Sequence, residues 1–555
     1  MSRPLSRRAL FPLSVALAGA GAIPSTADAA SIDDQGRGVV LDAGVHRVTA
    51  NITIKTDLRL QPGATIDIAQ GATLTVLGHL AAPVAPIFTG AGRVDLNHSR
   101  TPHAHPEWWG ASPGDGGRDS LPALQACLAA HPIMHLLAAD YYISAGFVVE
   151  RPFCRIAGAG FRGTQGWQGT RLILTNGTGD VMRVGPATRP ATVNDYPQNI
   201  DIRALALSRA AAVDATAGRL PTGLAAQFLL YAHFEQISAA EHSVGFRARG
   251  LVRSQLIDCV AFRSLPGVRA GQPWRGFLLD GMDDIGLAGG NASLFLTDCN
   301  ATIGGDPQVS DGVGLLLEGA FADSFITNFE ATNIATGIRV DGRTGQIGAR
   351  ARNGHVNLHL RMPIVDQCGD IGIAIRDTSA HMMIDIADPY VAAGPRATAA
   401  IACDAMHGSL SISGGQLVGM TNSAAGGTAA GLQARDSDGL QIQGLKILDH
   451  PRPIALSGCR GFALQGWIAN PGYPSGRDAV MLRDCVGGTV SMLVSGRSGS
   501  FASGVRIDGT CQRLRIDATG HDDAALTNGA SARVRLGDQG VAIPYRRDGI
   551  LIDGA

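Results

Sequence analysis

The sequence GFLLDG at residues 276–281 returns, in altered form, throughout the C-terminal half of the chain. Close copies are GFRARG at 245–250, GLLLEG at 314–319, GIRVDG at 337–342, GIAIRD at 372–377, GLQARD at 431–436 and GVRIDG at 504–509. Looser copies begin at Gly223, Ala399, Pro453 and Ala479. Each copy reads Gly, apolar, any, apolar, any, then Asp or Gly, and this two-residue alternation is typical of a β-strand.

The spacing of these copies indicates how the strands are connected. Successive copies begin 22 to 38 residues apart, so the length between strands varies while the strand itself stays constant. A regular strand with irregular connections is the pattern of a solenoid that gains one coil per repeat and accepts insertions at its turns. The sequence therefore predicts a stack of β-coils.

The composition of the 555-residue chain suits this fold and excludes some partners. It has 73 glycines, 5% aromatic and 17% charged residues, and a formal net charge of −1. Without an excess of positive charge, the chain is not expected to bind nucleic acid or an anionic membrane surface. No zinc-ligand spacing is present among its nine cysteines, and no metal site is predicted. We interpret the cysteines as buried filling, with a Cys259–Cys299 disulfide as an alternative.

The first 29 residues are typical of a cleavable export signal. A basic start at residues 3–8 precedes an apolar stretch at 10–22, which is too short to span a bilayer, and a small-x-small cleavage site follows at 27–29. The pair Arg7-Arg8 leaves twin-arginine export open beside the general route. We expect a secreted or periplasmic protein without a transmembrane segment.

The remaining chain divides into four predicted parts. Residues 30–100 alternate apolar and polar positions between glycine breaks and are predicted to form a β-rich N-terminal module. Residues 101–118 are rich in His, Pro and Gly and are predicted to be a linker. The solenoid is expected over 119–540, with a short helix at 119–130 that caps its open end, because an end coil would otherwise expose its core. A C-terminal tail occupies 541–555.

The segment around this helix also carries a family resemblance. Its residues are Pro106-Glu107-Trp108-Trp109-Gly110-Ala111, Gly114-Asp115-Gly116, Asp119-Ser120 and Ala123-Leu124-Gln125-Ala126. They resemble the entry segment of pectate-lyase-like proteins, in particular the rhamnogalacturonase/epimerase-like group that includes phage tailspikes. The resemblance implies an all-β, right-handed, single-stranded parallel β-helix and a polysaccharide partner. It also implies a homotrimer, since tailspike-like proteins often form parallel trimers, but it does not select a reaction.

Five acidic residues in the second strand of successive repeats are the predicted centre of the chemistry. They are Glu235, Asp258, Asp298, Glu330 and Asp366, each expected to point outward. In register, acids of adjacent coils would lie about 4.8 Å apart. Retaining glycosidases hold their carboxyls about 5 to 5.5 Å apart and inverting ones about 6.5 to 9.5 Å apart. We therefore predict Asp258, Asp298, Glu330 and Glu235 as catalytic residues.

A structural role is the alternative for any acid that precedes a turn, because its side chain can bond the turn's backbone. We apply this interpretation to a second set of acids at the ends of the repeat copies. That set is Asp280, Glu318, Asp341, Asp377, Asp436, Asp484 and Asp508.

Substrate binding is predicted from loop residues beside the acids. Trp167 and Trp274 lie in Gly-rich loops, where an indole ring can stack on a sugar, although a packing role is the alternative. Arg275 and Asp366 complete the predicted binding set. Insertions at 265–275 and 303–311 are expected to form groove walls.

These features predict a secreted polysaccharide-degrading enzyme, with glycoside hydrolysis by paired carboxylates as the leading interpretation. Hydrolysis requires no cofactor. A polysaccharide lyase or epimerase of the same fold is the first alternative, and a lyase would need calcium or a neutralising arginine, with Arg263 or Arg275 as base. A non-catalytic glycan-binding spike is the second alternative.

Overall fold

The computed structural model describes most of the chain, and its contacts divide the chain into two units. It describes residues 38–161, 169–211, 213, 220–264, 274–280, 291–304, 312–319, 321–342, 356–419, 429–470, 477–496, 501–522, 534–536 and 550–552. The predicted export signal, Trp167 and most of the predicted C-terminal tail lie outside these residues. The boundary between the units falls between Thr101 and Pro102.

The first unit is a small parallel β-structure of three coils with three strands each. Its sheets are β1-β4-β7, β2-β5-β8 and β3-β6-β9, and each pairs in parallel. Alternate residues such as Leu58, Ile66 and Leu74 are fully buried between the sheets. The strands are β1 (Val39–Leu41), β2 (Gly44–Val48), β3 (Ile52–Ile54), β4 (Leu58–Leu60), β5 (Ala64–Ile68), β6 (Thr73–Val76), β7 (Leu80–Ala81), β8 (Phe88–Gly90) and β9 (Arg93–Asp95).

The second unit opens with two short helices, η2 (Pro106–Trp109) and α1 (Leu121–Ala130). The α1 helix packs on η2 and on strands β10 and β12 of the first coil, and it buries Leu124 and Cys127 completely. Asp119 precedes the N-cap residue Ser120, and its Oδ1 accepts the N–H of Leu121, the first residue of α1, at 3.0 Å. The predicted linker 101–118 is largely part of this unit, since Ala104 pairs with Met134 and Trp108 is buried.

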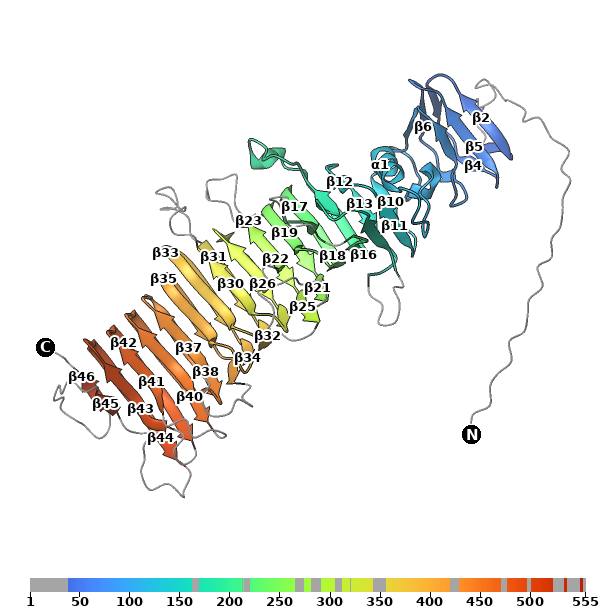
Figure 1. Cartoon of the computed structure of the whole chain (residues 1–555). Coiled ribbons are helices and arrows are strands. Elements are labelled where there is room, and N and C mark those ends of the chain that lie inside the picture. The colour runs from blue at the N-terminus through green and yellow to red at the C-terminus, as the bar shows by residue number, and fades with distance from the viewer. Residues whose placement is uncertain are drawn as a thin grey trace, which may run out of the picture. The chain divides into compact units, whose positions relative to one another are not determined.

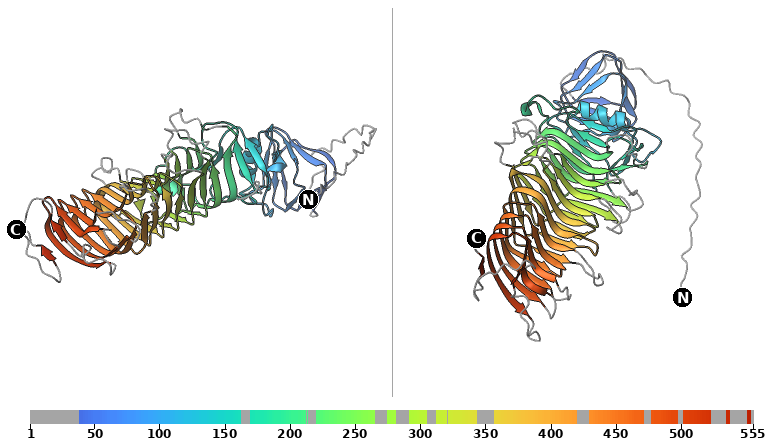
Figure 2. Two further views of the ribbon diagram at one scale, coloured as in Figure 1. Left: turned by 60° about the horizontal axis from the view of Figure 1, so that its bottom comes forward. Right: turned by 60° about the vertical axis from the view of Figure 1, so that its left-hand side comes forward.

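From β10 onward the chain forms a right-handed parallel β-helix, as the repeats and the resemblance predict. In all, 60% of the protein is strand and 4% is helix. Each coil contributes strands to three faces, and the coils follow one another in chain order (Figure 1). Two further views show strands of successive coils side by side (Figure 2). Only β46 (Ile550–Ile552) pairs antiparallel, with β44, among the described strands.

Face 1 contains the repeat copies. Its strands are β12 (Phe147–Val149), β15 (Met182–Val184), β17 (Thr222–Leu230), β19 (Val244–Val252), β22 (Arg275–Asp280), β26 (Val313–Glu318), β30 (Thr336–Asp341), the first parts of β33 (Ile371–Ala387) and β35 (Ala399–Ser413), β37 (Ala430–Arg435), β39 (Arg452–Ser457), β41 (Arg477–Arg483), β43 (Phe501–Asp508) and β45 (Val534–Leu536).

Face 2 follows face 1 within each coil. Its strands are β10 (Ile133–His135), β13 (Arg155–Ala157), the first parts of β16 (Asp201–Arg209) and β18 (His233–Ala240), β20 (Gln255–Ile257), β24 (Phe295–Thr297), β28 (Ser324–Thr327), β31 (Val356–Arg361), the last parts of β33 and β35, and the first parts of β38 (Leu440–Leu448), β40 (Arg460–Asn470), β42 (Val486–Gly496) and β44 (Gln512–Asp522). The short strands β23 (Asn291–Ala292) and β27 (Phe321–Ala322) lead into it.

Face 3 completes the coil. Its strands are β11 (Asp140–Ile143), β14 (Arg171–Leu174), the last parts of β16 and β18, β21 (Val260–Ser264), β25 (Asn300–Gly304), β29 (Glu330–Thr332), β32 (Ile364–Cys368), β34 (Tyr390–Ala393), β36 (Gln416–Gly419) and the last parts of β38, β40, β42 and β44.

The repeat copies stack in register along face 1. Leu224, Phe246 and Phe277 are paired in turn, so the glycines that precede them are aligned as well. A Cβ on Gly245 would lie 2.6 Å from Gly276 O and 2.7 Å from the Ala261 Cβ of face 3. The glycine of the motif is therefore required by close packing inside the coil.

The register also corrects one predicted start. Ile373 pairs with Ile401, so the copy predicted to begin at Ala399 begins one residue later.

The corners between faces 2 and 3 are built from left-handed residues. Asp258, Asp298 and Asn328 occupy successive corners with φ of 49°, 54° and 53°. Asp and Asn enter this conformation more readily than other residues with a side chain. In these three coils the corner ends the strand of face 2 and fixes which residues point outward on face 3.

Two further features concern the whole described chain. Its cysteines are all free thiols, including the neighbouring Cys259 and Cys299. None of its helices is long and apolar enough to cross a bilayer.

Candidate active site

The five predicted acids do not form one column, so this part of the prediction is wrong. Asp258 and Asp298 lie at corners, whereas Glu235 lies on face 2 opposite Ile257. Glu330 lies on face 3 opposite Asn300, and Asp366 lies opposite Thr332. The acids differ in their position relative to the corner between faces 2 and 3. Asp258 and Asp298 occupy the corner itself, Glu235 precedes it on face 2, and Glu330 follows it on face 3.

Asp258 and Asp298 have structural roles at their corners. The Asp258 N–H donates to Thr297 O at 3.0 Å, and the Asp298 N–H donates to Thr327 O at 3.1 Å. Asn328 Nδ2 donates to Asp298 Oδ1 at 2.6 Å, which ties one corner to the next. The left-handed φ of both residues, together with this side-chain bond at Asp298, accounts for an acid or amide at these corners. A catalytic role for either aspartate stays a prediction.

Glu235 belongs to a cluster of charged side chains on face 2. Arg203 Nη1 lies 3.0 Å from Glu235 Oε2, and Arg203 Nε lies 2.5 Å from Asp201 Oδ1. His233 Nε2 is 3.6 Å from the same Glu235 oxygen. The carboxylate of Glu235 is thus bound to an arginine that it shares with Asp201.

Trp274 does not occupy the exposed position that was predicted for it. Its side chain is only 1% exposed, so its ring cannot stack on a sugar, and the packing alternative applies. Arg263 is 2% exposed and is therefore unavailable as the base of a lyase. Arg275 begins β22 on face 1, where its Nη1 donates to Trp274 O at 2.9 Å. Trp167 lies outside the described residues.

Three other acids do form a row, and they are on face 1. Asp280 of β22 pairs with Glu318 of β26, and Glu318 pairs with Asp341 of β30. All three point outward and are partly buried, with the Asp280 and Asp341 side chains 15% and 16% exposed. Adjacent strands place the α-carbons of neighbours about 4.8 Å apart. We call these three residues the carboxylate row.

Arginines hold both outer members of the carboxylate row. Arg247 Nη2 lies 3.1 Å and Arg249 Nε 3.8 Å from Asp280 Oδ2. Arg339 Nη2 lies 2.6 Å from Asp341 Oδ2. The same column continues with Arg249 before Asp280 and Arg376 after Asp341. Positive charge at both ends offsets the repulsion that three stacked carboxylates would otherwise produce.

An apolar cluster lies beside the carboxylate row. Leu278 and Leu316 are paired two residues before Asp280 and Glu318, and they pack with Val244 and Val313. These side chains are on the outer side of face 1, yet they are at most 9% exposed. A dry flank of this kind strengthens the interactions of nearby charges. The row therefore combines paired carboxylates, arginines and a low-polarity wall.

No metal centre is evident at the row. Over the residues that the structure describes, no group of three or more His, Cys, Asp or Glu side chains could hold a metal ion.

The sequence contains a signal for the carboxylate row. GFLLDG, GLLLEG and GIRVDG are three consecutive copies with an acid in the same motif position, where the copies on either side have Arg249 and Arg376. Their position just before a turn favours the structural interpretation given above, because an acid there can bond the turn's backbone. The alternation within each strand already predicts that these three acids point outward, and the alignment of the copies predicts that they stack in register.

Comparison with known proteins extends only to the fold. No family model matches the chain, and no curated protein sequence matches it significantly. Solved structures of similar fold include tailspike protein 3 of bacteriophage CBA120, at 11% identity over 80% of this chain and 62% of that chain, with a TM-score of 0.43. The present chain thus spans less than two thirds of that tailspike.

Two enzymes of carbohydrate chemistry are also similar in fold. The A-module of an Azotobacter vinelandii mannuronan C-5 epimerase is 13% identical over 76% of this chain and 99% of that chain, with a TM-score of 0.44. The catalytic unit of a GH87 α-1,3-glucanase from Streptomyces thermodiastaticus is 14% identical over 76% and 69%, with a TM-score of 0.38. The parallel β-helix that the resemblance implies is confirmed as the fold of this chain.

Proposed function

We propose that the protein cleaves a polysaccharide by hydrolysis, and that the carboxylate row supplies the acid and the base. The observation that supports this most directly is the register of Asp280, Glu318 and Asp341 on three adjacent strands. Glycoside hydrolysis needs two carboxyl groups on either side of one bond. The elongated outer face of a β-helix suits an extended chain substrate.

The arginine contacts suggest how the roles divide. Asp280 and Asp341 each accept a charged contact from arginine, which holds each carboxylate in place. We assign one of them as the nucleophile or base and Glu318, between them, as the acid that protonates the leaving oxygen.

The spacing of the row allows two stereochemical outcomes. Neighbouring members at about 4.8 Å fit the about 5 to 5.5 Å of a retaining enzyme, in which a carboxylate attacks the sugar and water later displaces it. The two outer members, two coils apart, lie close to the upper limit of about 9.5 Å for an inverting enzyme. We favour retention, because Glu318 is a direct neighbour of both aspartates.

The first prediction compares the carboxylate row with the corner acids. Glu318→Gln should lower the rate of polysaccharide cleavage by about 10² to 10⁴, the usual contribution of a general acid, while the thermal melting point stays close to wild type. Reducing-end release from a panel of polysaccharides measures this. Asp436→Asn, at a left-handed turn residue with φ of 45°, is the matched control and should retain full activity.

The rival assignment is tested in the same assay. Asp298→Asn should also retain activity if its role is structural. A large loss in Asp298→Asn with a fully active Glu318→Gln would transfer the chemistry to the corner acids and remove the row from the mechanism. If cleavage by the wild type is absent across the panel while binding is retained, the protein is a glycan-binding spike.

Elimination by a lyase is a second candidate, favoured by the arginines beside the row. Arg247 and Arg339 stand next to Leu278 and Leu316, where either could neutralise the carboxylate of an acidic sugar. A lyase leaves a carbon–carbon double bond in its product, so ultraviolet absorbance of the products separates elimination from hydrolysis. We also propose that the substrate lies outside the cytoplasm, in keeping with the export signal at residues 1–29.

A further inference from the structure

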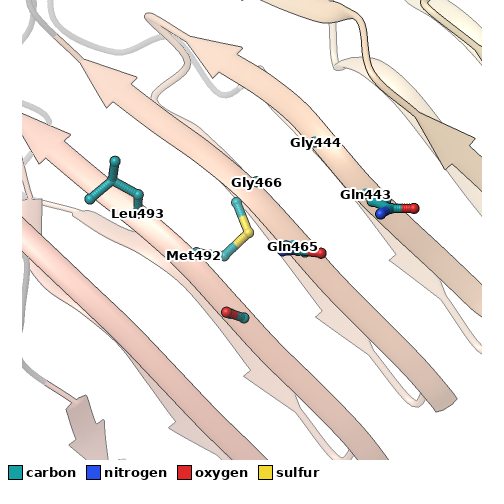
Figure 3. Close-up of a pocket in the computed structure, with 7 residues that line it drawn as sticks. Gln443, Gly444, Gln465, Gly466, Met492 and Leu493 are labelled. Atoms are coloured by element: carbon teal, nitrogen blue, oxygen red, sulfur yellow. The ribbon is translucent and has the colours of Figure 1, made fainter. Parts of the chain in front are cut away.

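A second surface with the features of a binding site lies on face 2 of the C-terminal coils. Two adjoining depressions, of ≈ 540 Å³ and ≈ 440 Å³, share Gln443, Gln465 and Ser491. They extend over β38, β40 and β42, several coils beyond the carboxylate row and on a different face of the β-helix. Figure 3 shows Gln443 and Gln465 side by side on neighbouring strands. We call this surface the glutamine groove.

The backbone explains why the surface is hollow here. In earlier coils a left-handed residue, such as Asp258, Asp298 or Asp388, lies between faces 2 and 3, but β40 and β42 run through this position without one. The register shifts between Gln443 and Leu445, which leaves Gly444 as an extra residue with φ of 70°. Gly444 and Gly466 line the floor without side chains, so the space above them remains open.

The polar groups of the glutamine groove are almost all uncharged. Amides come from Gln441, Gln443 and Gln465, and hydroxyls from Thr489 and Ser491. Among the described lining residues no carboxylate is present, and Arg515 is the single charged group, in the last coil of the groove. Amides and hydroxyls can each donate and accept hydrogen bonds, as sugar hydroxyls do.

An apolar ledge runs beside these polar groups. Trp467 pairs with Lys446 on one side and Leu493 on the other, and its side of the strand faces outward. Trp467 is 38% exposed and Leu493 is 45% exposed. Trp467 Nε1 donates to Ser495 Oγ at 2.9 Å, which fixes the orientation of the indole ring. The groove thus offers hydrogen-bonding groups next to a fixed, partly exposed aromatic surface.

We propose that the glutamine groove binds an uncharged glycan chain, with Gln443, Gln465 and Ser491 bonding its hydroxyls and Trp467 contacting the apolar face of a sugar ring. Sugars present these two kinds of surface together, and a large aromatic residue with a polar neighbour complements both. Arg515 is the single charged group among the described lining residues, and Lys446 lies on the strand beside Trp467, so the groove offers little charge to a polyanion. This inference concerns binding alone and does not depend on the chemistry of the carboxylate row.

Affinity electrophoresis of the full-length protein tests the proposal. The gels contain dextran, galactomannan or β-glucan as uncharged probes, and alginate as the acidic probe. Wild type should be retarded by at least one uncharged probe and not by alginate. Trp467→Ala, and separately the double variant Gln443→Ala with Gln465→Ala, should lose at least about tenfold in affinity, equivalent to about 1.4 kcal/mol.

A matched pair of variants on face 2 of earlier coils controls for the loss of exposed groups. Phe295 is 40% exposed and pairs with the exposed Gln255, so Phe295→Ala and Gln255→Ala remove an aromatic ring and an amide far from the glutamine groove. Both should bind like wild type. Light scattering on each variant monitors self-association, since a second copy of the chain is the other occupant that the apolar ledge would fit.

Three results would overturn the proposal. The first is the absence of retardation by every uncharged probe. The second is retardation that Trp467→Ala and the glutamine double variant leave unchanged. The third is a wild-type oligomer that Trp467→Ala dissociates, which would make the groove a contact between subunits. Since hydrolysis is not measured, an inactive carboxylate row would leave all of these readouts unaffected.

Discussion

The aspartates at the corners show that the same residue type in a sequence can be interpreted as catalytic or as structural. Asp298 combines a left-handed φ of 54° with a hydrogen bond from Asn328 Nδ2. We predict that Asp298→Asn changes the free energy of unfolding by less than about 0.5 kcal/mol, because Asn accepts the same bond and tolerates the same φ. Asp298→Val should cost about 1 to 3 kcal/mol, since a β-branched residue is strained there and accepts no bond.

Urea unfolding monitored by circular dichroism measures both variants of Asp298. Equal stability of the valine and asparagine variants would show that the corner imposes no conformational requirement.

For single residues the sequence was a poor guide, because its motifs show which residues are acidic but not where the chain turns. Trp274 has the same difficulty: a tryptophan between glycines can be buried or exposed, and only the packing decides.

The same ambiguity concealed Trp467. It lies within the strand β40, in the sequence GFALQGWIAN, and several of its apolar neighbours are buried. Alternation gives two faces for such a strand, but a sequence does not say which apolar residues face inward when both faces contain some. The register shift near Gly444 also changes which residue of β40 lies opposite which residue of β38, and no local sequence pattern indicates this shift.

At the scale of the strand, the repeat motif was a reliable guide. Its glycine is fixed by contacts between coils, and its apolar positions form the interior of face 1, so the same six-residue pattern recurs wherever a coil passes. We predict that Gly245→Ala lowers the free energy of unfolding of the second unit by about 1 to 3 kcal/mol or more. The added methyl would overlap Gly276 O and the Ala261 Cβ, and a packed interior has little room to yield.

Gly304→Ala is the control for this substitution. Gly304 ends the strand β25, and an added Cβ there would meet its nearest neighbour, in Phe262, at an ordinary 3.5 Å. Its urea midpoint should therefore stay near that of wild type. Similar losses in both variants would attribute the effect to glycine replacement in general rather than to the close approach of coils.

The carboxylate row was accessible from the sequence at this same scale. The repeat alignment puts Asp280, Glu318 and Asp341 at one motif position, and strands in register then place them together. Our corner acids came from a looser alignment of second strands, whose lengths vary. Candidate functional residues are therefore best predicted from the strand whose register the sequence repeats determine most clearly.

The β-helix as a whole buries histidines that must be neutral to stay inside it. His242 Nε2 donates to Leu207 O at 3.0 Å, and its Nδ1 accepts from Arg209 Nε at 2.9 Å. Burial, reinforced by the positive charge of Arg209, lowers the pKa of His242 to about 3. Burial likewise lowers the pKa of His450 to about 4. A protonated imidazole at either place would be a desolvated charge.

These lowered pKa values predict acid sensitivity of the fold. The unfolded chain binds protons at these histidines below a pKa of about 6.5, while the folded chain does so only near pH 3 to 4. Stability from the neutral forms is thus complete above about pH 6.5 and declines as the pH falls toward 4, by at most about 1.4 kcal/mol per pH unit for each histidine. His242→Gln, which keeps a donor and an acceptor but cannot be protonated, should reduce this slope.

Melting temperatures between pH 7 and pH 4 measure the slope for wild type, His242→Gln and the exposed control His381→Gln. The control should follow wild type, whereas His242→Gln should lose part of its stability at pH 7 and less of it on acidification. Parallel curves for wild type and His242→Gln would mean that His242 takes up no proton on unfolding. The hydrophobic core is continuous from one coil to the next. Local unfolding at His242 therefore exposes Leu207 and the interior beside it. Protonation of this one histidine can thus lower the stability of neighbouring coils as well as its own.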